Sequence, residues 1–265
     1  MPDHHPHHDV SGSGPVLLVM PGGAGHPMGL EGAVARLAER FTVVTADPLG
    51  LSRGPLEGPV EDQRVEAWSD HAHRLLDALL PDGESAYVFG SSSGAIAAVD
   101  LLARHPHRLR HVVAHEPPSV EVLPDAARQR AMFAEVDEIG RTEGLGAAMA
   151  RLQAGLEGTA WEGAPTAVPD PDPDSPMGVF LGHVLLPFTS YAPDLAALKT
   201  HSARLTLGAG HDSPGQLPYR TAAALAELSG ADFTEFPGGH LGVLQHPAAF
   251  ADRLAAVFDG AAEDA

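Results

Sequence analysis

A serine between an apolar strand and an apolar helix is the first residue of this chain that could do chemistry. Ser92 lies in the run Val88-Phe89-Gly90-Ser91-Ser92-Ser93-Gly94-Ala95-Ile96, which contains the pattern G-x-S-x-G. A sharp turn from strand to helix strains the serine backbone, and a glycine two residues to either side relieves the steric overlap. A hydroxyl on such a turn projects above the carboxyl end of a sheet, beside the free N–H groups that open the helix. The pattern predicts a nucleophilic serine.

The same five-residue pattern occurs a second time, at residues 50–54. This copy also follows a strand-like run, at 41–46, but it leads into residues 55–59, whose two prolines prevent a helix from starting there. Residues 95–102, by contrast, combine strong helix formers with an apolar face. The surrounding sequence therefore favours Ser92 as the nucleophile.

A serine nucleophile needs a base to take its proton, and His240 has the best position among the 16 histidines. It follows the last expected strand in the glycine-rich turn 236–242, on the same edge of the sheet as Ser92. His115, at the end of another expected strand, is an alternative base.

The imidazole in turn needs an acceptor for its other ring nitrogen. Asp212 follows the strand expected at 204–207 and is predicted to lie on a loop beside His240. The chain order Ser92, Asp212, His240 is the order of serine, acid and histidine expected when the serine lies on a turn from a strand to a helix. Glu116, after the strand expected at 109–114, is the alternative acid, and the sequence leaves both open.

Composition indicates a globular α/β protein with one core. The 265 residues are 44% hydrophobic and 19% charged, which is enough apolar material for a sizeable core, and no long polar linker divides them. A formal net charge of −19 disfavours nucleic acid or an anionic membrane surface as a partner, so a small-molecule substrate is expected. The absence of cysteine excludes disulfides, a thiolate nucleophile and cysteine-ligated metals.

Neither a signal-like apolar segment near the start nor a later apolar run of transmembrane length is visible, so a cytoplasmic location is expected. Four histidines between positions 4 and 8 resemble a tag-like segment.

Alternating strands and helices predict a mostly parallel sheet with helices on both faces. Strands are expected at 15–20, 41–46, 85–89, 109–114, 204–207 and 231–236, and helices at 30–40, 61–80, 95–102, 217–228 and 248–258. Helical patterns follow one another without strands from 119 to 200. We therefore expect one domain, with a core of residues 1–118 and 201–265 and an inserted helical cap of residues 119–200.

The cap is expected to line an apolar substrate pocket. Its candidate pocket residues lie on three helical stripes and are Met132, Phe133, Met149, Phe180, His183, Val184 and Phe188.

From Pro15 to Phe258 the chain resembles the α/β-hydrolase family. The motifs that carry the resemblance are the glycine loop at 20–25, the elbow at 90–94, Asp212, and Pro237-Gly238-Gly239-His240. The resemblance implies an eight-stranded sheet and an oxyanion hole made by the N–H groups of Ser93 and Gly23. It implies acyl transfer to water through Ser92, with no cofactor and no metal.

This chain departs from the family pattern in two places that bear on the fold. Pro21 stands where the family loop usually begins with histidine, and only about fifteen residues precede the first confident strand. Short or missing leading strands would leave an exposed sheet edge that favours a homodimer.

The expected function is hydrolysis of an ester, lactone or thioester of a small to medium apolar substrate. The alternative is a cofactor-free lyase or cyclase acting on a natural-product intermediate, or a ligand-binding protein of the same fold with little turnover.

Overall fold

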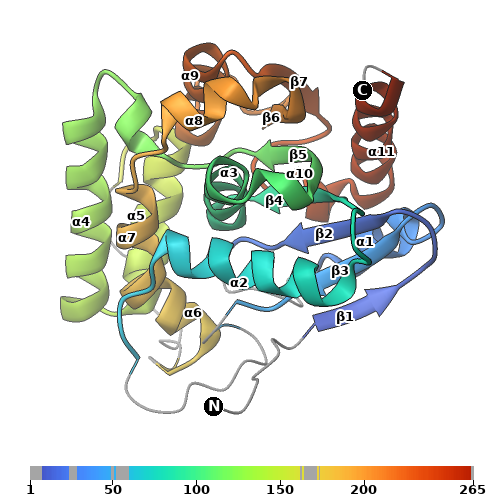
Figure 1. The fold of residues 1–265 in the computed structure, drawn as a ribbon. Coiled ribbons are helices and arrows are strands. Elements are labelled where there is room, and N and C mark those ends of the chain that lie inside the picture. The colour runs from blue at the N-terminus through green and yellow to red at the C-terminus, as the bar shows by residue number, and fades with distance from the viewer. Residues whose placement is uncertain are drawn as a thin grey trace.

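A seven-stranded sheet runs through the centre of the protein, seen here in a computed structural model (Figure 1). The structure describes residues 8–23, 29–48, 51, 60–161, 163, 172 and 174–263. The strands lie in the order β1-β3-β2-β4-β5-β6-β7. Their bounds are β1 His8–Ser11, β2 Val16–Met20, β3 Thr42–Ala46, β4 Ala86–Ser91, β5 Leu109–His115, β6 Leu205–Gly210 and β7 Asp232–Phe236.

Strand β1 pairs antiparallel with β3, and the other described pairings are parallel. Parallel neighbours need a crossover connection, which explains why strands alternate with helices along the chain. They also bring their carboxyl ends to one edge of the sheet. At that edge Met20 of β2 pairs with Gly90, and Ser91 of β4 pairs with His115 of β5. This edge carries the candidate site.

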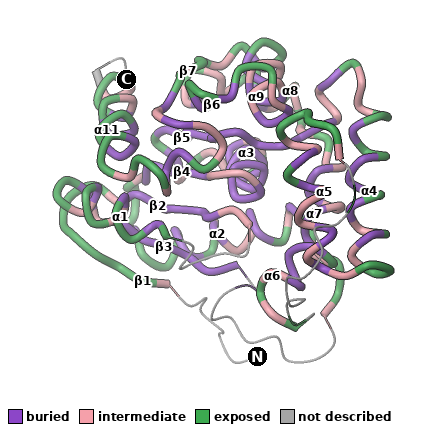
Figure 2. The backbone as a smooth tube through the Cα atoms, turned by 180° about the vertical axis from the view of Figure 1, so that it is seen from behind, coloured by how far each residue is buried: buried purple, intermediate pink, exposed green. Residues whose placement is uncertain are grey.

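Helices cover both faces of the sheet (Figure 2). Because strand side chains alternate, Leu18 and Val88 face one core while Leu17 and Phe89 face the other. The first core includes residues of α2, α3 and α9, and the second includes residues of α1 and α11. The bounds are α1 Glu31–Leu37, α2 Val65–Leu79, α3 Ser93–Arg104, α9 Leu217–Ser229 and α11 Pro247–Glu263.

Between β5 and β6 the described residues form helices and no strand. We call this segment, residues 119–200, the helical insertion; in Figure 1 its helices α4, α5 and α7 lie beside the sheet. Its elements are η2 Val120–Val122, α4 Ala126–Thr142, α5 Leu145–Glu157, α6 Pro176–Val179, η3 Phe180–Val184, α7 Leu185–Thr189 and α8 Leu195–Thr200. The remaining short helices of the described chain are η1 Pro106–Arg108, η4 Ser202–Arg204 and α10 Gly242–Gln245.

Contacts with α2 and α3 help to attach the insertion to the core helices. The ring of Phe188 in α7 packs edge-on against Trp68 of α2, with centroids 4.5 Å apart. Just beyond α7, the Tyr191 hydroxyl donates a hydrogen bond of 2.5 Å to Asp100 Oδ1 in α3. Asp100 is 1% exposed, so this bond joins the insertion to a buried carboxylate of the helix that follows Ser92.

The predicted fold class is confirmed, and the expected strands and helices are present with end shifts of a few residues. The described sheet has seven strands rather than the eight that the family resemblance implied. The leading strand β1 is short and largely exposed, which explains why its apolar pattern gave no signal. No helix in the described part of the chain is both long and apolar enough to cross a bilayer.

Among the described histidines, three have a strongly lowered pKa because their surroundings disfavour the charged form. Burial lowers the pKa of His71, His111 and His115 to about 4. Their ordinary pKa is 6.5, so between about pH 6.5 and 4 the unfolded chain binds more protons than the folded one. Above pH 6.5 these imidazoles are neutral in both states and do not lower the free energy of unfolding. Below pH 6.5 they take up protons in the unfolded chain first, so the free energy of unfolding falls as the pH decreases.

We predict that His111→Gln weakens this pH dependence. The wild-type free energy of unfolding should fall between pH 7 and pH 5, and the variant's should fall less, by up to about 1.4 kcal/mol per pH unit below 6.5. Urea unfolding at both pH values measures the difference. His211→Gln is the control because the His211 side chain is 73% exposed. Equal pH slopes for His111→Gln and the wild type would contradict the prediction.

Candidate active site

Ser92 occupies a strained turn between β4 and α3. Its φ of +53° and ψ of −121° lie in a region that side-chain-bearing residues rarely adopt. The flanking glycines make the turn possible: a Cβ at Gly90 would lie 2.6 Å from the Gly94 carbonyl oxygen, and one at Gly94 would overlap the Met20 carbonyl. The structure thus shows the strand, turn and helix around Ser92 that the G-x-S-x-G pattern indicated.

His240 reaches Ser92 from the loop between β7 and α10. Its Nε2 lies 3.2 Å from Ser92 Oγ, within hydrogen-bonding distance. The loop turns at Gly238, whose φ of +81° favours glycine. His240 is partly exposed, so its ring reaches the cavity described below while one nitrogen stays inside the protein.

The other ring nitrogen of His240 contacts Glu116. Glu116 Oε2 lies 2.7 Å from His240 Nδ1, and the carboxylate is fully buried. With Glu116 ionised, Nδ1–H donates to the carboxylate and Nε2 is free to accept the proton of Ser92. Serine, histidine and glutamate therefore form one continuous chain of hydrogen bonds.

The prediction that Asp212 accepts the hydrogen bond from His240 Nδ1 is wrong, because Glu116 accepts it. Asp212 lies on the loop after β6 as expected, and its N–H donates to Gly238 O at 2.9 Å. Its side chain is exposed and lines the cavity. The residue that turns inward at this loop is its neighbour Ser213, which is 0% exposed. Glu116, the alternative left open by the sequence, is the carboxylate that contacts His240.

The second oxygen of Glu116 is held by the same loop. Oε1 accepts a hydrogen bond of 2.9 Å from Gly210 N–H and one of 2.5 Å from Ser213 Oγ. Burial alone would raise the pKa of Glu116, but the hydrogen bond from His240, the His240 and His115 charges and the Ser213 bond together lower it to about 2. Glu116 is therefore an anion at neutral pH. Sequence reasoning missed Ser213, because a serine after a strand end carries no distinguishing pattern.

His115, the alternative base, does not serve Ser92 in this arrangement. Its ring lies in the second core, edge-on against the stacked rings of Phe236 and Phe250, whose centroids are 5.6 and 5.1 Å away. Its backbone does contribute, because the His115 carbonyl accepts a hydrogen bond of 3.0 Å from Ser92 N–H.

A cavity of about 530 Å³ opens above Ser92 and His240. Three of the expected pocket residues, Phe133, Met149 and Phe180, lie in its wall. Leu152 and Leu185 of the insertion add to this apolar side. Polar groups form another part of the wall and are Gln153, Glu157, Asp212, Gln216 and Gln245.

Four expected pocket residues lie outside the cavity wall because they pack elsewhere. Phe188 packs on Trp68, and Val184 is fully buried in the first core. His183 Nδ1 lies 3.0 Å from Asp62 Oδ1, toward the segment before α2. Met132 fills the space beside Gly155 of α5.

The glycine loop after β2 lies directly against Ser92. A Cβ on Gly22 would come within 2.7 Å of Ser92 Cβ, so only glycine allows this approach. Gly23, with φ +57°, lines the cavity, and Ser93 is the first residue of α3. The rest of the expected loop, residues 24 and 25, and the second G-x-S-x-G copy, except Leu51, lie outside the described residues.

Similarity to known proteins extends over most of the chain. The family model described as "Alpha/beta hydrolase family" matches residues 16–253. A protein of Bacillus subtilis (strain 168) named "Uncharacterized hydrolase YraK" is 35% identical over 253 residues, which cover 94% of this chain and 90% of that relative. Among solved structures, the enol-lactonase from Burkholderia xenovorans LB400 matches with a TM-score of 0.67 at 17% identity, over 96% of each chain. A thermophilic esterase from Thermogutta terrifontis matches with a TM-score of 0.70 at 17% identity, over 96% of this chain and 93% of the esterase.

We predict that Glu116→Gln slows covalent labelling of Ser92 by a fluorophosphonate far more than Asp212→Asn does. Loss of the carboxylate from such a triad costs about 10⁴ in turnover elsewhere, and we expect a fall of that size in the labelling rate for Glu116→Gln. Asp212→Asn should stay within about threefold of the wild type, because the structure pairs His240 with Glu116. Time-resolved mass spectrometry of the labelled protein gives both rates. A larger loss for Asp212→Asn would return the role of the acid to Asp212.

Proposed function

The chain belongs to the alpha/beta hydrolase family, and from that premise we propose that it is a serine hydrolase acting on ester-type bonds. The observation that carries the proposal is the hydrogen-bonded chain Ser92–His240–Glu116 beside the large cavity. The family membership supports hydrolysis as the reaction. The occurrence of the same fold in an enol-lactonase and an esterase agrees with the choice of ester, lactone or thioester.

In the proposed mechanism, His240 Nε2 takes the Ser92 proton as the serine oxygen attacks the substrate carbonyl. Glu116 stabilises the imidazolium that forms and keeps Nδ1 protonated. The N–H groups of Ser93 and Gly23 are the proposed donors to the oxyanion. His240 then protonates the leaving oxygen or sulfur, and water, deprotonated by the same imidazole, releases the acyl group from Ser92.

The cavity indicates the kind of substrate. Its volume of about 530 Å³ lies within the usual range for small-molecule sites, about 300–1,000 Å³, so a compound of medium size fits. Phe133, Met149 and Phe180 offer an apolar surface to an acyl chain or ring. Among the described residues that line the cavity there is no lysine or arginine, whereas Glu157 and Asp212 are carboxylates. We therefore propose neutral, mostly apolar esters or lactones rather than anionic ones.

The first test of this function is Ser92→Ala. We expect the wild type to hydrolyse p-nitrophenyl esters and to be labelled once by a fluorophosphonate, and we expect Ser92→Ala to lose both. Ser91→Ala is the matched control, since Ser91 also lines the cavity but precedes the strained turn. The melting temperature of each variant reports on folding.

Wild-type turnover by Ser92→Ala, or labelling at Ser91, would contradict the assignment of the nucleophile. A folded wild-type protein that neither labels nor turns over esters would favour a lyase or a ligand-binding protein instead.

We further predict discrimination by charge. Like charges at 4 Å repel by about 1 kcal/mol in water and more in a partly dry site, so an anionic hemi-ester should have a kcat/KM at least about tenfold below that of a neutral ester of equal length. The paired substrates p-nitrophenyl butyrate and mono-p-nitrophenyl succinate provide the measurement. Glu157→Gln should reduce the ratio of kcat/KM for the butyrate to kcat/KM for the succinate. A wild-type preference for the succinate would exclude neutral esters as the proposed substrate class.

A further inference from the structure

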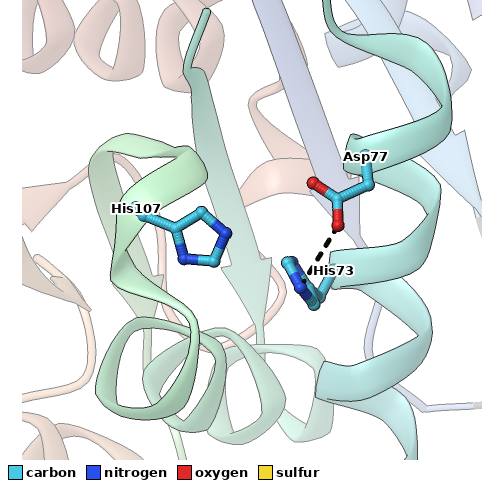
Figure 3. A group of neighbouring side chains, drawn as sticks. All are labelled: His73, Asp77 and His107. Carbon is cyan, nitrogen blue, oxygen red and sulfur yellow. Dashed lines mark ion pairs between the residues drawn. The ribbon is translucent and has the colours of Figure 1, made fainter. Parts of the chain in front are cut away.

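His73, Asp77 and His107 form a group of potential metal ligands (Figure 3), and none of them belongs to the wall of the cavity. His73 and Asp77 are one turn apart on α2 and therefore share a face of that helix. His107 comes from η1, between α3 and β5, and Figure 3 shows its ring across from the other two side chains. Each of the three residues offers one ligand atom, and these atoms all lie within 4.8 Å of one another.

Two imidazole nitrogens and one carboxylate oxygen form a ligand set typical of Zn²⁺. Zinc binds such atoms at about 2.0–2.2 Å in tetrahedral geometry, which places neighbouring ligand atoms about 3.4 Å apart. His73 Nε2 and Asp77 Oδ2 already lie 3.3 Å apart, the dashed contact in Figure 3. His107 is exposed, so its side chain can close the remaining distance by rotation without disturbing the core.

Neighbouring groups hold the first two ligands in place. The ring of His105 stacks on that of His73, with centroids 4.2 Å apart and planes 10° apart. His105 is itself fixed by a hydrogen bond of 2.8 Å between its Nε2 and Asp70 Oδ1. The stacked ring of His105 restricts the rotation of the His73 ring, whose Nε2 lies beside Asp77.

Asp77 is oriented in the same way by Arg108. Arg108 Nε donates a hydrogen bond of 2.8 Å to Asp77 Oδ1, and Arg108 Nη1 donates to the Pro81 carbonyl at 2.9 Å. The guanidinium therefore engages one carboxylate oxygen and leaves Oδ2 turned toward His73.

We propose that His73, Asp77 and His107 bind one Zn²⁺ ion, with water as the fourth ligand. The ion would join α2 to the segment that leads from α3 into β5. It would act on stability and not on the reaction, because His105 caps the carboxyl end of α3 whereas Ser92 precedes its other end. Twelve helical residues separate the two ends, a length of about 18 Å.

Zinc titration of the metal-stripped full-length protein tests the proposal. The histidines at positions 4, 5, 7 and 8 could also bind zinc, so the titrations use a background in which all four are replaced by alanine. Isothermal titration calorimetry should show one ion per chain. Zinc should raise the melting temperature in a concentration-dependent way, because a ligand that binds only the folded state stabilises it. Co²⁺ in place of Zn²⁺ should give the visible absorption of a tetrahedral site.

In that background, His107→Ala and Asp77→Asn should each weaken zinc binding by at least about tenfold, as loss of supporting groups at metal sites already does. His211→Ala is the matched control: it removes an exposed histidine that pairs with one carboxylate, Glu235, at 3.4 Å. The control should keep full affinity. Ester turnover by His107→Ala should equal that of the wild type, so this test and that of the proposed function can fail separately.

Absence of a one-to-one zinc site in the four-alanine background would overturn the proposal. So would equal zinc affinity in His107→Ala and His211→Ala, since the binding would then come from scattered surface histidines.

Discussion

The hydrogen bond between His240 Nδ1 and Glu116 Oε2 is the contact on which the candidate site depends. It joins the loop after β7 to the end of β5 and turns Nε2 toward Ser92. A fully buried carboxylate is stable only when its lone pairs have donors, and His240, Gly210 N–H and Ser213 Oγ supply them. Breaking one partner of such a buried pair typically costs about 3–5 kcal/mol. The same bonds that fix the imidazole therefore also fix the β6 loop.

Sheet register explains how Glu116 reaches that position. Ser91 and His115 are paired and are the last residues of β4 and β5. The residues that follow them, Ser92 and Glu116, therefore leave the sheet side by side. Both have positive φ, and among the described residues they are the two non-glycine residues that do. Two hydrogen bonds hold these conformations, from Ser92 N–H to His115 O and from Glu116 N–H to Gly208 O. The two residues with a strained backbone are thus the two whose side chains contact His240.

Sequence patterns predicted the parts of the site whose evidence is local. Glycines two residues to either side identified Ser92, and a glycine-rich turn after an expected strand identified His240. The acid could not be assigned in this way, because Asp212 and Glu116 both follow strands that end at the same edge. The choice depends on which side chain of the β6 loop turns inward, and this is Ser213, not Asp212.

The sequence also could not predict which buried residues of the helical insertion line the cavity. Helical periodicity placed Phe180 and Phe188 on one apolar stripe, and both were expected to line the pocket; both are buried, but only Phe180 lies in the cavity wall. It could not specify the partner: Phe180 lines the cavity, whereas Phe188 packs on Trp68 of α2. Periodicity defines which face of a helix is covered, and only the tertiary arrangement decides what covers it.

Helix α3 connects these separate features of the molecule. Ser92 precedes its first residue, and Asp100 in its interior accepts hydrogen bonds from Tyr191 of the insertion and from Ser69 of α2. Arg104 in its last turn also lies 3.3 Å from Asp100. Because Asp100 is buried and these neighbours supply its donors, the insertion cannot shift relative to α3 without leaving a buried carboxylate short of partners. Helix α3 therefore follows Ser92 directly and is also bonded to the insertion, whose residues form the apolar side of the cavity wall.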